Sequence, residues 1–599
     1  MTSTMTALVG RRAVADYTRR PLNLVLLVVV PVVLVFVWGG SLADFSKLFG
    51  GPGNRAQIEA ATAGWAAAAL AGLAGFFQVT GSRSTDRRLA AAGGRYAPVV
   101  AGRLGASLCL AMVAAAGGLV ALAARSGITD PPRAVAATVL IAIIYLALGV
   151  LVGTVVKTEM NGALLVTLAW VFDVFLGPAM GSGSSAMTRL FPLHFPTLVL
   201  TGQASGHAGP LGDVAWSILW AAGLSTVAVV RLTTSTRPVP VPAQHASGAE
   251  TAIRPAVAPT RAPQLAIAPR SPSAPASARP VATTRTPGAA GGAPVAARMA
   301  AVLRAGMREH RRNRVLWALL VVVPAVFIGM AIIVTVDKPG PITLVEGARQ
   351  FTAFLSERRI HAATMVPVTS AFLAGLTGLF VVTGSADGDR RLVLAGFRPR
   401  EVLAGRLGVV AAATVLTTAV AVAVSGARYP PRQWAVFAIA NLLIALTYAM
   451  IGVLVGPLTG RLGGLYLILL LAFIDVGLGQ SVMFPSGPPA WGAYLPARGA
   501  SRVMLDGAFT ARFDQFGYLL LGLAWLVALT AASSEVFRRR TAAARPSRVH
   551  HDAAPTSPAA DPAAKLATRL RRRPQRVSVV RADVAIVPRT DDGLRGKES

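Results

Sequence analysis

Two aspartates are the only ionisable residues well inside the long apolar segments of this 599-residue chain. Asp173 lies in the string VFDVFLG and Asp475 in the similar string FIDVGLG. An aspartate at the centre of a membrane helix costs about 2.5–3.5 kcal/mol, so it is rarely incidental and usually faces an interior or a water path. Two interpretations stay open. The carboxylates line a central pathway, where they contact a cationic substrate or carry protons, or they join packed helices through hydrogen bonds, for example with Tyr145 and Tyr448.

A polar, basic element occurs twice with its spacing preserved. Residues 80–105 read TGSRSTDRRLAAAGGRYAPVVAGRLG, residues 383–408 read TGSADGDRRLVLAGFRPREVLAGRLG, and 16 of the 26 aligned positions are identical. Positive charge alone would set membrane topology, whereas a preserved spacing also fits a docking surface for a cytoplasmic partner. The aspartates could cap a short helix, the glycines could turn the backbone and the arginines project charge. The residues concerned are Asp86, Arg87, Arg88 and Gly93 in the first copy, and Asp389, Arg390, Arg391 and Gly396 in the second.

Motifs for enzymatic chemistry are missing from the sequence. There is no GxxxxGK[ST] phosphate-binding loop, and the string GLRGKES near the C-terminus has the wrong spacing and no strand before it. The histidines form no pair at metal-ligand spacing, and no Ser, His and Asp combine as a nucleophile and its base. The single cysteine, Cys109, excludes an intrachain disulfide and a thiolate metal site. We therefore expect a chain that is not an enzyme and holds no cofactor.

The elements that must position these residues are long apolar helices. Of all residues, 54% are hydrophobic and only 14% are charged, against about 25% charged in soluble domains. Apolar runs of about 20 residues recur, and each is long enough to cross a bilayer. This composition excludes a soluble enzyme, a disulfide scaffold and a wholly disordered chain. The net charge of +32 is spread over loops and flanking segments, which fits contact with anionic membrane lipids rather than nucleic-acid binding.

The chain is a tandem duplication. Besides the basic element, YLALGVLVG (145–153) matches YAMIGVLVG (448–456) at the same separation. Each copy contains six apolar runs, and because six is even, both copies begin and end on one side of the membrane. The runs are 22–38, 61–80, 104–124, 134–156, 161–180 and 214–232, then 315–336, 362–383, 407–425, 433–456, 463–483 and 516–536. We predict an all-α integral membrane protein with twelve transmembrane helices arranged as two parallel six-helix repeats.

Polar and basic segments flank the two repeats. The predicted units are a first repeat at 1–235, a disordered Pro/Ala-rich linker at 236–295 with 12 of the 40 prolines, a second repeat at 296–540 and a disordered basic tail at 541–599. Residues 5–20 and 296–314 precede the first run of each copy. They are predicted to be amphipathic helices in the membrane interface, with an unstructured basic arm as the alternative.

The distribution of basic residues predicts the orientation. Short loops and arms expected in the cytoplasm hold 22 Lys and Arg, whereas the opposite loops hold 14. This bias favours cytoplasmic N- and C-termini, with the first run retained as a membrane span rather than cleaved as a signal peptide. Pro31 and Pro324 are interpreted as kinks in the first run of each copy rather than as gating hinges.

These features together resemble the permease subunit of type-2 ATP-binding cassette (ABC) transporters. The shared pattern is an interfacial helix, six spans, and a cytoplasmic loop after the second span with charged residues, a small-residue turn and a hydrophobic run into the third span. The short basic loop at 157–160, with Arg461 in the second copy, and the prolines before run six (Pro192, Pro196 and Pro496) fit the same pattern. Two copies in one chain resemble the fused permeases assigned to export of polyketide antibiotics.

The resemblance implies a function and a division of labour. The loop after the second span would form a coupling helix in a groove of the ATPase subunit, which implicates the eight residues of the basic element named above. Two separate ATPase subunits, with ATP and Mg, would drive the two halves to move an amphiphilic drug, antibiotic or lipid outward across the plasma membrane. Two alternatives stay open: a proton-coupled secondary transporter that uses Asp173 and Asp475, and a membrane scaffold without flux.

Overall fold

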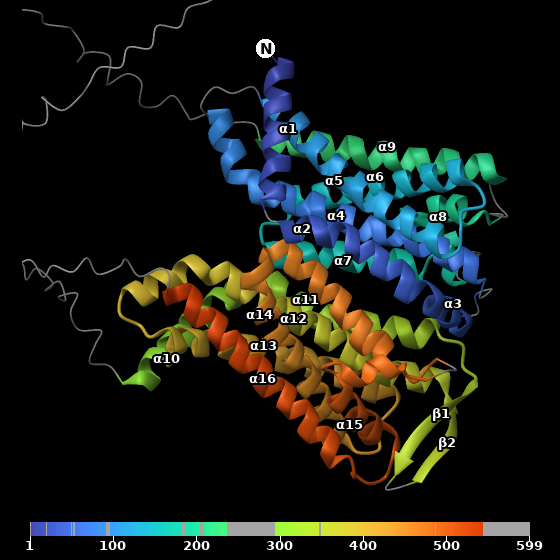
Figure 1. Ribbon diagram of the computed structural model, residues 1–599, viewed down its shortest axis with the longest axis vertical. Coiled ribbons are helices and arrows are strands. Elements are labelled where there is room, and N and C mark those ends of the chain that lie inside the picture. The colour runs from blue at the N-terminus through green and yellow to red at the C-terminus, as the bar shows by residue number, and fades with distance from the viewer. Residues whose placement is uncertain are drawn as a thin grey trace, which may run out of the picture. The chain divides into compact units, whose positions relative to one another are not determined.

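Helices form almost all of the described part of the chain (Figure 1). The computed structural model describes residues 2–19, 21–49, 51, 54–91, 96–181, 186–203, 209–236, 294–346, 349–484 and 487–542. The first half contains α1 (Thr2–Thr18), α2 (Pro21–Val33), the π-helix η1 (Leu34–Trp38), α3 (Gly39–Leu48), α4 (Arg55–Ala91), α5 (Tyr96–Arg125), α6 (Pro131–Val155), α7 (Glu159–Phe175), α8 (His194–Thr201) and α9 (Gly209–Thr236). The second half contains α10 (Val295–Arg312), α11 (Arg314–Val334), β1 (Pro339–Glu346), β2 (Arg349–Ser356), α12 (Glu357–Leu394), α13 (Pro399–Arg428), α14 (Trp434–Leu471), the π-helix η5 (Ala472–Gly479), α15 (Arg498–Phe509) and α16 (Phe516–Ala542).

Ten helices of the described ranges are long and apolar enough to cross a membrane, in agreement with the predicted all-α membrane fold. Such helices satisfy their backbone hydrogen bonds internally, as a lipid environment requires. The twelve expected runs do not all appear as separate long helices. The run at 161–180 is shorter than expected, because α7 has 17 residues and ends at Phe175. The two runs between 433 and 483 form one helical stretch, Trp434–Gly479, whose backbone leaves helical geometry at Gly460 (φ 77°, ψ −174°).

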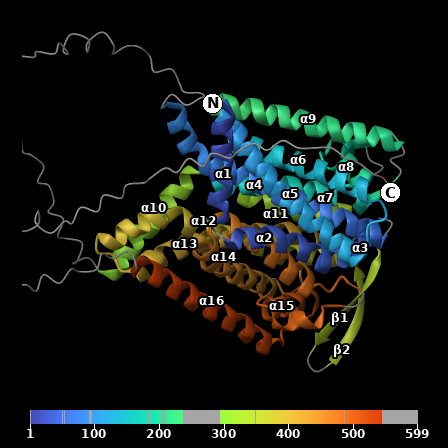
Figure 2. The same cartoon turned by 45° about the horizontal axis from the view of Figure 1, so that its top comes forward.

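A β-hairpin follows α11, where the sequence suggested only a basic loop. β1 pairs antiparallel with β2, with Ile342 opposite Ala353 and Leu344 opposite Phe351. Ile342 and Leu344 are buried between exposed neighbours, so one face of β1 is packed and the other is open. Figures 1 and 2 both show the hairpin and α10 at opposite ends of the second half. We call the end with β1 and β2 the hairpin end. We call the opposite end the basic end, after the arginines around α10 and the end of α12.

The duplication is visible in the helix boundaries and in one repeated contact. α5 and α13 begin 303 residues apart and also end 303 residues apart. In the first half, a β-carbon on Gly149 of α6 would overlap the carbonyl oxygen of Gly72 on α4. In the second half, one on Gly452 of α14 would overlap the carbonyl oxygen of Gly375 on α12. The string around Gly149 and Gly452 therefore recurs because only glycine allows these two backbones to approach so closely.

The two segments predicted to be amphipathic helices are helical. α1 covers most of 5–20 and α10 most of 296–314. Arg298 of α10 donates through Nε and Nη2 to the two carboxylate oxygens of the buried Glu401 on α13, at 3.0 and 2.9 Å. Pro31 and Pro324 lie inside α2 and α11. Apart from a few boundary residues, the predicted linker and tail lie outside the described residues.

The hydrophobic core continues across the boundary between the two halves. Phe77 of α4 stacks on Phe380 of α12, with ring centroids 6.3 Å apart and planes inclined by 7°. The two phenylalanines occupy equivalent positions of the repeats. Tyr466 of α14 donates its hydroxyl to the Leu70 carbonyl oxygen of α4 at 3.1 Å. The halves are therefore packed on each other along α4, α12 and α14.

Candidate functional site

An aromatic chamber lies on the boundary between the halves. Its walls come from η1, α3 and α7 of the first half and from α11, α12, η5 and α15 of the second. The aromatic side chains that line it are Trp38, Phe45, Phe49, Phe175, Phe327, His361, Phe473 and Phe484. Its free volume is about 80 Å³, below the roughly 300–1,000 Å³ of sites that hold small organic ligands. In this conformation the chamber is too small for such a ligand.

Two π-helical segments from different halves meet at the chamber. Trp38 ends η1 and contacts Phe473 of η5 edge to face, with ring centroids 5.0 Å apart. π-Helical turns are uncommon and occur often at functional sites, because they break the regular backbone pattern and redirect side chains. Their meeting here makes the chamber the leading candidate site on structural grounds.

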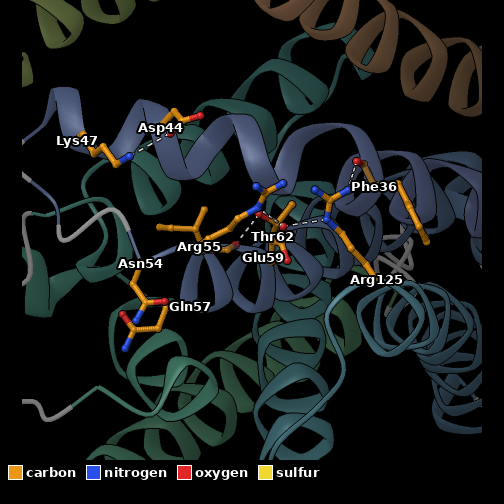
Figure 3. A network of polar contacts seen from close by, with 10 residues as sticks. Phe36, Asp44, Lys47, Asn54, Arg55, Gln57, Glu59, Thr62 and Arg125 are labelled. Atoms are coloured by element: carbon orange, nitrogen blue, oxygen red, sulfur yellow. Dashed lines mark hydrogen bonds and ion pairs between the residues drawn. The ribbon is translucent and has the colours of Figure 1, made fainter. Parts of the chain in front are cut away.

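A buried carboxylate, Glu59, is linked to η1 through Arg125 (Figure 3). Glu59 of α4 accepts hydrogen bonds through Oε1 from Arg55 Nε at 3.1 Å and from Arg125 Nε at 2.9 Å. Arg125, at the end of α5, also donates through Nη1 to the carbonyl oxygen of Phe36 inside η1. The guanidinium thus ties the irregular turn to α4 and α5. The second half has Ala362 at the position of Glu59, so this clamp is not repeated there.

Asp173, the first candidate pathway residue, is buried in a hydrogen-bond network. The Tyr145 hydroxyl of α6 donates to its Oδ2, and the Leu193 amide donates to its Oδ1 at 3.1 Å. Leu193 directly precedes α8. The Asp173 carboxylate therefore joins α7 to α6 and to the residue before α8.

Asp475 repeats this network in the second half. Its Oδ2 accepts from the Tyr448 hydroxyl at 2.9 Å and from the Ala497 amide at 2.9 Å, and its Oδ1 accepts from Gln480 Nε2 at 3.2 Å. Ala497 directly precedes α15. Neither Asp173 nor Asp475 lines the chamber or the two larger cavities described below. The contacts agree with the interpretation in which these aspartates bind packed helices together.

For the two aspartates of the basic element, the expectation that they cap short helices is wrong. Asp86 and Asp389 do not cap short helices, because α4 and α12 continue for several residues beyond them. Both are buried. Arg406 of α13 donates through Nε and Nη2 to Asp389 Oδ1 at 3.0 and 2.9 Å, and Arg103 of α5 donates to Asp86 at 3.3 Å. A buried charge needs such a partner, so each of these ion pairs joins two helices.

The remaining residues of the basic element are placed differently. Arg88, Arg390 and Arg391 are exposed at the basic end. Gly396 ends α12 in a left-handed conformation (φ 97°), which glycine adopts without strain, so the predicted turn is confirmed in the second copy. Gly93 and the side chain of Arg87 lie outside the described residues. The exposed arginines form a charged surface next to a fixed turn.

Four residues of the ion pairs and of the chamber were not predicted from the sequence: Arg103, Arg406, Glu59 and His361. Arg103 and Arg406 could have been found, because each follows its aspartate by 17 residues in both copies. Glu59 and His361 had no such signal, because each occurs in one copy only. His361 is buried between Phe45 and Phe49 and shares a 2.6 Å hydrogen bond with the Thr335 hydroxyl.

Two larger cavities lie at opposite ends of the helices that line the chamber. At the hairpin end, a vestibule of about 760 Å³ is bounded by α3, the hairpin, the start of α12 and α15, and it shares Met483 and Phe484 with the chamber. At the basic end, a cavity of about 880 Å³ is lined by Phe77, Asp389 and Arg461 among others. α12 runs from Glu357 in the vestibule to Asp389 in the basic-end cavity, and the narrow chamber lies between.

Neither a metal site nor a known relative identifies the chain. Within the described ranges, no three His, Cys, Asp or Glu side chains gather closely enough to hold a metal ion. No model of a protein family matches the sequence, and no curated protein matches it. Function must therefore be argued from the cavities and from the charges around them.

Proposed function

We propose that this chain is the transmembrane permease subunit of an ATP-driven ABC exporter for an amphiphilic small molecule. The observation that carries the proposal is the narrow aromatic chamber between two duplicated halves, with a larger cavity at each end of the helices that line it. Alternating access needs a central site whose two exits open in turn as one repeat moves against the other. An aromatic, largely uncharged wall suits an amphiphile better than an ion.

The proposal includes twelve crossings of the plasma membrane. The stretch Trp434–Gly479 has 46 residues, which is about 69 Å of helix at 1.5 Å per residue, more than twice a bilayer core of about 30 Å. Gly460 lines the basic-end cavity, whereas Met483, just beyond η5, lines the vestibule. Two crossings that reverse near Gly460 account for this length. α7 would be a short twelfth span, and the positive-inside rule places the basic end in the cytoplasm.

Energy would come from two separate cytoplasmic ATPase subunits that bind ATP and Mg. The surface proposed to receive them is the exposed set Arg88, Arg390 and Arg391, beside the turn at Gly396. Asp86 and Asp389 would support this surface indirectly, because their ion pairs hold in place the helices that carry it.

Charge reversal tests the coupling surface. Replacing Arg88, Arg390 and Arg391 together by Glu should abolish co-purification of the ATPase subunits, while the protein still inserts into the membrane. The matched control reverses two exposed arginines at the hairpin end, Arg349→Glu with Arg512→Glu, and should leave the complex intact. A complex of unchanged yield in the triple variant would contradict this assignment.

Reconstitution in proteoliposomes separates the proposed function from its alternatives. Flux of a fluorescent amphiphile is expected only when the ATPase subunits and ATP are both present. Flux driven by a pH gradient in this chain alone, lost in the double variant Asp173→Asn with Asp475→Asn, would establish the proton-coupled alternative instead. Membrane localisation of another protein, with no flux under either condition, would establish a scaffold.

A further inference from the structure

Two arginines without a carboxylate partner lie on the short helix α15. Arg498 is its first residue, and Arg502 follows one helical turn later. Neither forms an ion pair with any residue that the structure describes. Both side chains are half-buried, and Arg498 lies over the ring of Tyr518, 5.9 Å from its centroid. Two positive charges four residues apart on a helix repel each other, so an anion that contacts both guanidinium groups would be stabilised there.

Arg502 lines the vestibule at the hairpin end, where the other cations are already paired. Lys47 pairs with Asp44 at 3.1 Å, and Lys338 lies 3.6 Å from Glu357. The charged groups of this lining are therefore two neutral pairs, Arg502 and one further carboxylate.

That further carboxylate, Asp506, is enclosed by its own hydrogen bonds. The residue is 3% exposed, and it accepts from the Thr510 hydroxyl and from the backbone of Asp514. Burial lowers the pKa of Arg502, and the neighbouring charge of Arg498 lowers it further. The charged side chain that acts most strongly on Arg502 is therefore a second cation, and an anion is the complementary ligand.

Exposed aromatic residues surround the start of α15. Trp491 and Tyr494, in the segment just before it, are 42% and 82% exposed, and Phe516, the first residue of α16, is 62% exposed. α16 runs from Tyr518 in the vestibule to Thr541 in the basic-end cavity, so these aromatic side chains lie at the hairpin end of a membrane helix. Exposed tryptophan and tyrosine mark the level of the lipid headgroups. The two arginines therefore lie at the level where lipid phosphates are found.

The arginine pair belongs to the second copy only. Leu193, just before α8, and Ala497, just before α15, make the same contact with the buried aspartate of their half. Counted from these two positions, the arginines correspond to His194 and Leu198 in the first copy. The repeated fold therefore does not need two cations here, and they are available to a ligand.

We propose that Arg498 and Arg502 bind the phosphate group of an anionic phospholipid in the leaflet at the hairpin end. A guanidinium keeps its charge and donates several N–H groups to phosphate oxygens. Leu520, Leu523 and Val527 of α16 are exposed and provide an apolar surface for the acyl chains. The site lies at the opposite end of the molecule from the arginines proposed to receive the ATPase subunits. It relies on the crossing of the membrane by α16 and not on ATP-driven export.

Quenching by brominated lipids tests the site with the full-length chain in phosphatidylcholine vesicles. In a Cys109→Ser background, Gly517→Cys gives a label position next to Tyr518, because an added side chain there meets open space. A bimane label on this cysteine is quenched by phospholipids with brominated acyl chains that lie close to it. Brominated phosphatidylglycerol should bind at this position about fivefold more tightly than brominated phosphatidylcholine.

Removal of the two charges should abolish this preference. Arg498→Gln with Arg502→Gln should bring the ratio of the two affinities to about one. The matched control, Arg349→Gln with Arg512→Gln, removes the same charge from two exposed positions at the same end of the molecule. It should keep the preference for phosphatidylglycerol seen with the original arginines.

Equal affinity for the two lipids with both arginines in place would overturn the proposal, even if the glutamine variant failed to fold. An equal loss of preference in the control pair would also overturn it, because general surface charge would then suffice. Inorganic phosphate, compared with chloride at the same ionic strength, identifies the source of the anion. Loss of the lipid preference in phosphate alone would assign the arginines to a soluble anion and overturn the lipid site, and an unchanged preference would support it. Because no ATPase is present, failure of ATP-driven export would leave these results unaffected.

Discussion

Buried carboxylates in this chain are distinguished by the groups that neutralise them. Asp389 is held by a guanidinium, and Asp475 by a tyrosine hydroxyl and a backbone amide. Glu59 has two arginines. In these three cases the carboxylate oxygens are engaged by groups of the protein itself, so the residue contributes to packing.

The ion pair between Asp389 and Arg406 should be a major source of stability at the basic end. Asp389→Asn leaves the guanidinium buried without its charge partner, which typically costs about 3–5 kcal/mol. We expect a clearly lower unfolding midpoint in detergent, followed by intrinsic tryptophan fluorescence. Asp387→Asn is the control, because Asp387 is 90% exposed and its contact with Arg390 is 3.8 Å long. Similar midpoints for both variants would contradict a structural role for Asp389.

At the scale of elements, close helix packing and irregular turns have separate roles. The pairs α4–α6 and α12–α14 approach through glycines, which gives each half a rigid centre. The π-helices η1 and η5 lie instead at the boundary between the halves, where Trp38 meets Phe473. Regular helices therefore hold each repeat together, and the irregular turns shape the space between the repeats.

Substituting the repeated glycines should disrupt each half in the same way. An added β-carbon at Gly149 or Gly452 overlaps a backbone carbonyl of the facing helix, and backbone cannot move aside as a flexible side chain can. We expect Gly149→Ala and Gly452→Ala each to lower the yield of folded protein in size-exclusion chromatography. Gly329→Ala in α11, where the added carbon meets open space, should be neutral or slightly stabilising, since alanine favours helix by roughly 0.5–1 kcal/mol. Equal losses of folded protein for all three variants would indicate that alanine disturbs the helices themselves, and that the close backbone contact is not the cause.

At the scale of the whole molecule, polar contacts join the two halves side by side. Asn161 of α7 donates to Asn313, at the start of α11, at 3.0 Å. The amide of Val336 donates to the Leu48 carbonyl oxygen at 2.8 Å. The two contacts use different segments, so the boundary between the halves is held at more than one place.

Cross-linking can test this arrangement directly. Since Cys109 is the single cysteine, a Cys109→Ser background allows Asn161→Cys and Asn313→Cys to be joined by a short bismaleimide. After proteolytic cleavage within residues 237–293, the treated halves should still migrate as one species in denaturing gels. The pair Asn161→Cys with Arg349→Cys, whose second position lies at the hairpin end, is the control and should separate. Separation of both pairs would contradict the boundary seen here.

Much of the architecture could be predicted from the sequence, because it depends on properties that repeat along the chain. Apolar length and low charge predicted a helical membrane protein, and the matching strings predicted the duplication that α5 and α13 reproduce. The hydrogen bonds of Tyr145 and Tyr448 to the buried aspartates were also among the stated possibilities. These features follow from local composition and from comparison of one copy with the other.

Tertiary structure alone decided which charged residues are exposed and which are paired. Asp86 and Asp389 share a sequence element with exposed arginines, yet the helices continue past them and Arg103 and Arg406 reach back to pair with them. The hairpin and the meeting of η1 with η5 differ between the two copies or depend on distant segments. Periodicity and duplication describe one helix or one repeat at a time, whereas a cavity exists only where several helices leave space between them.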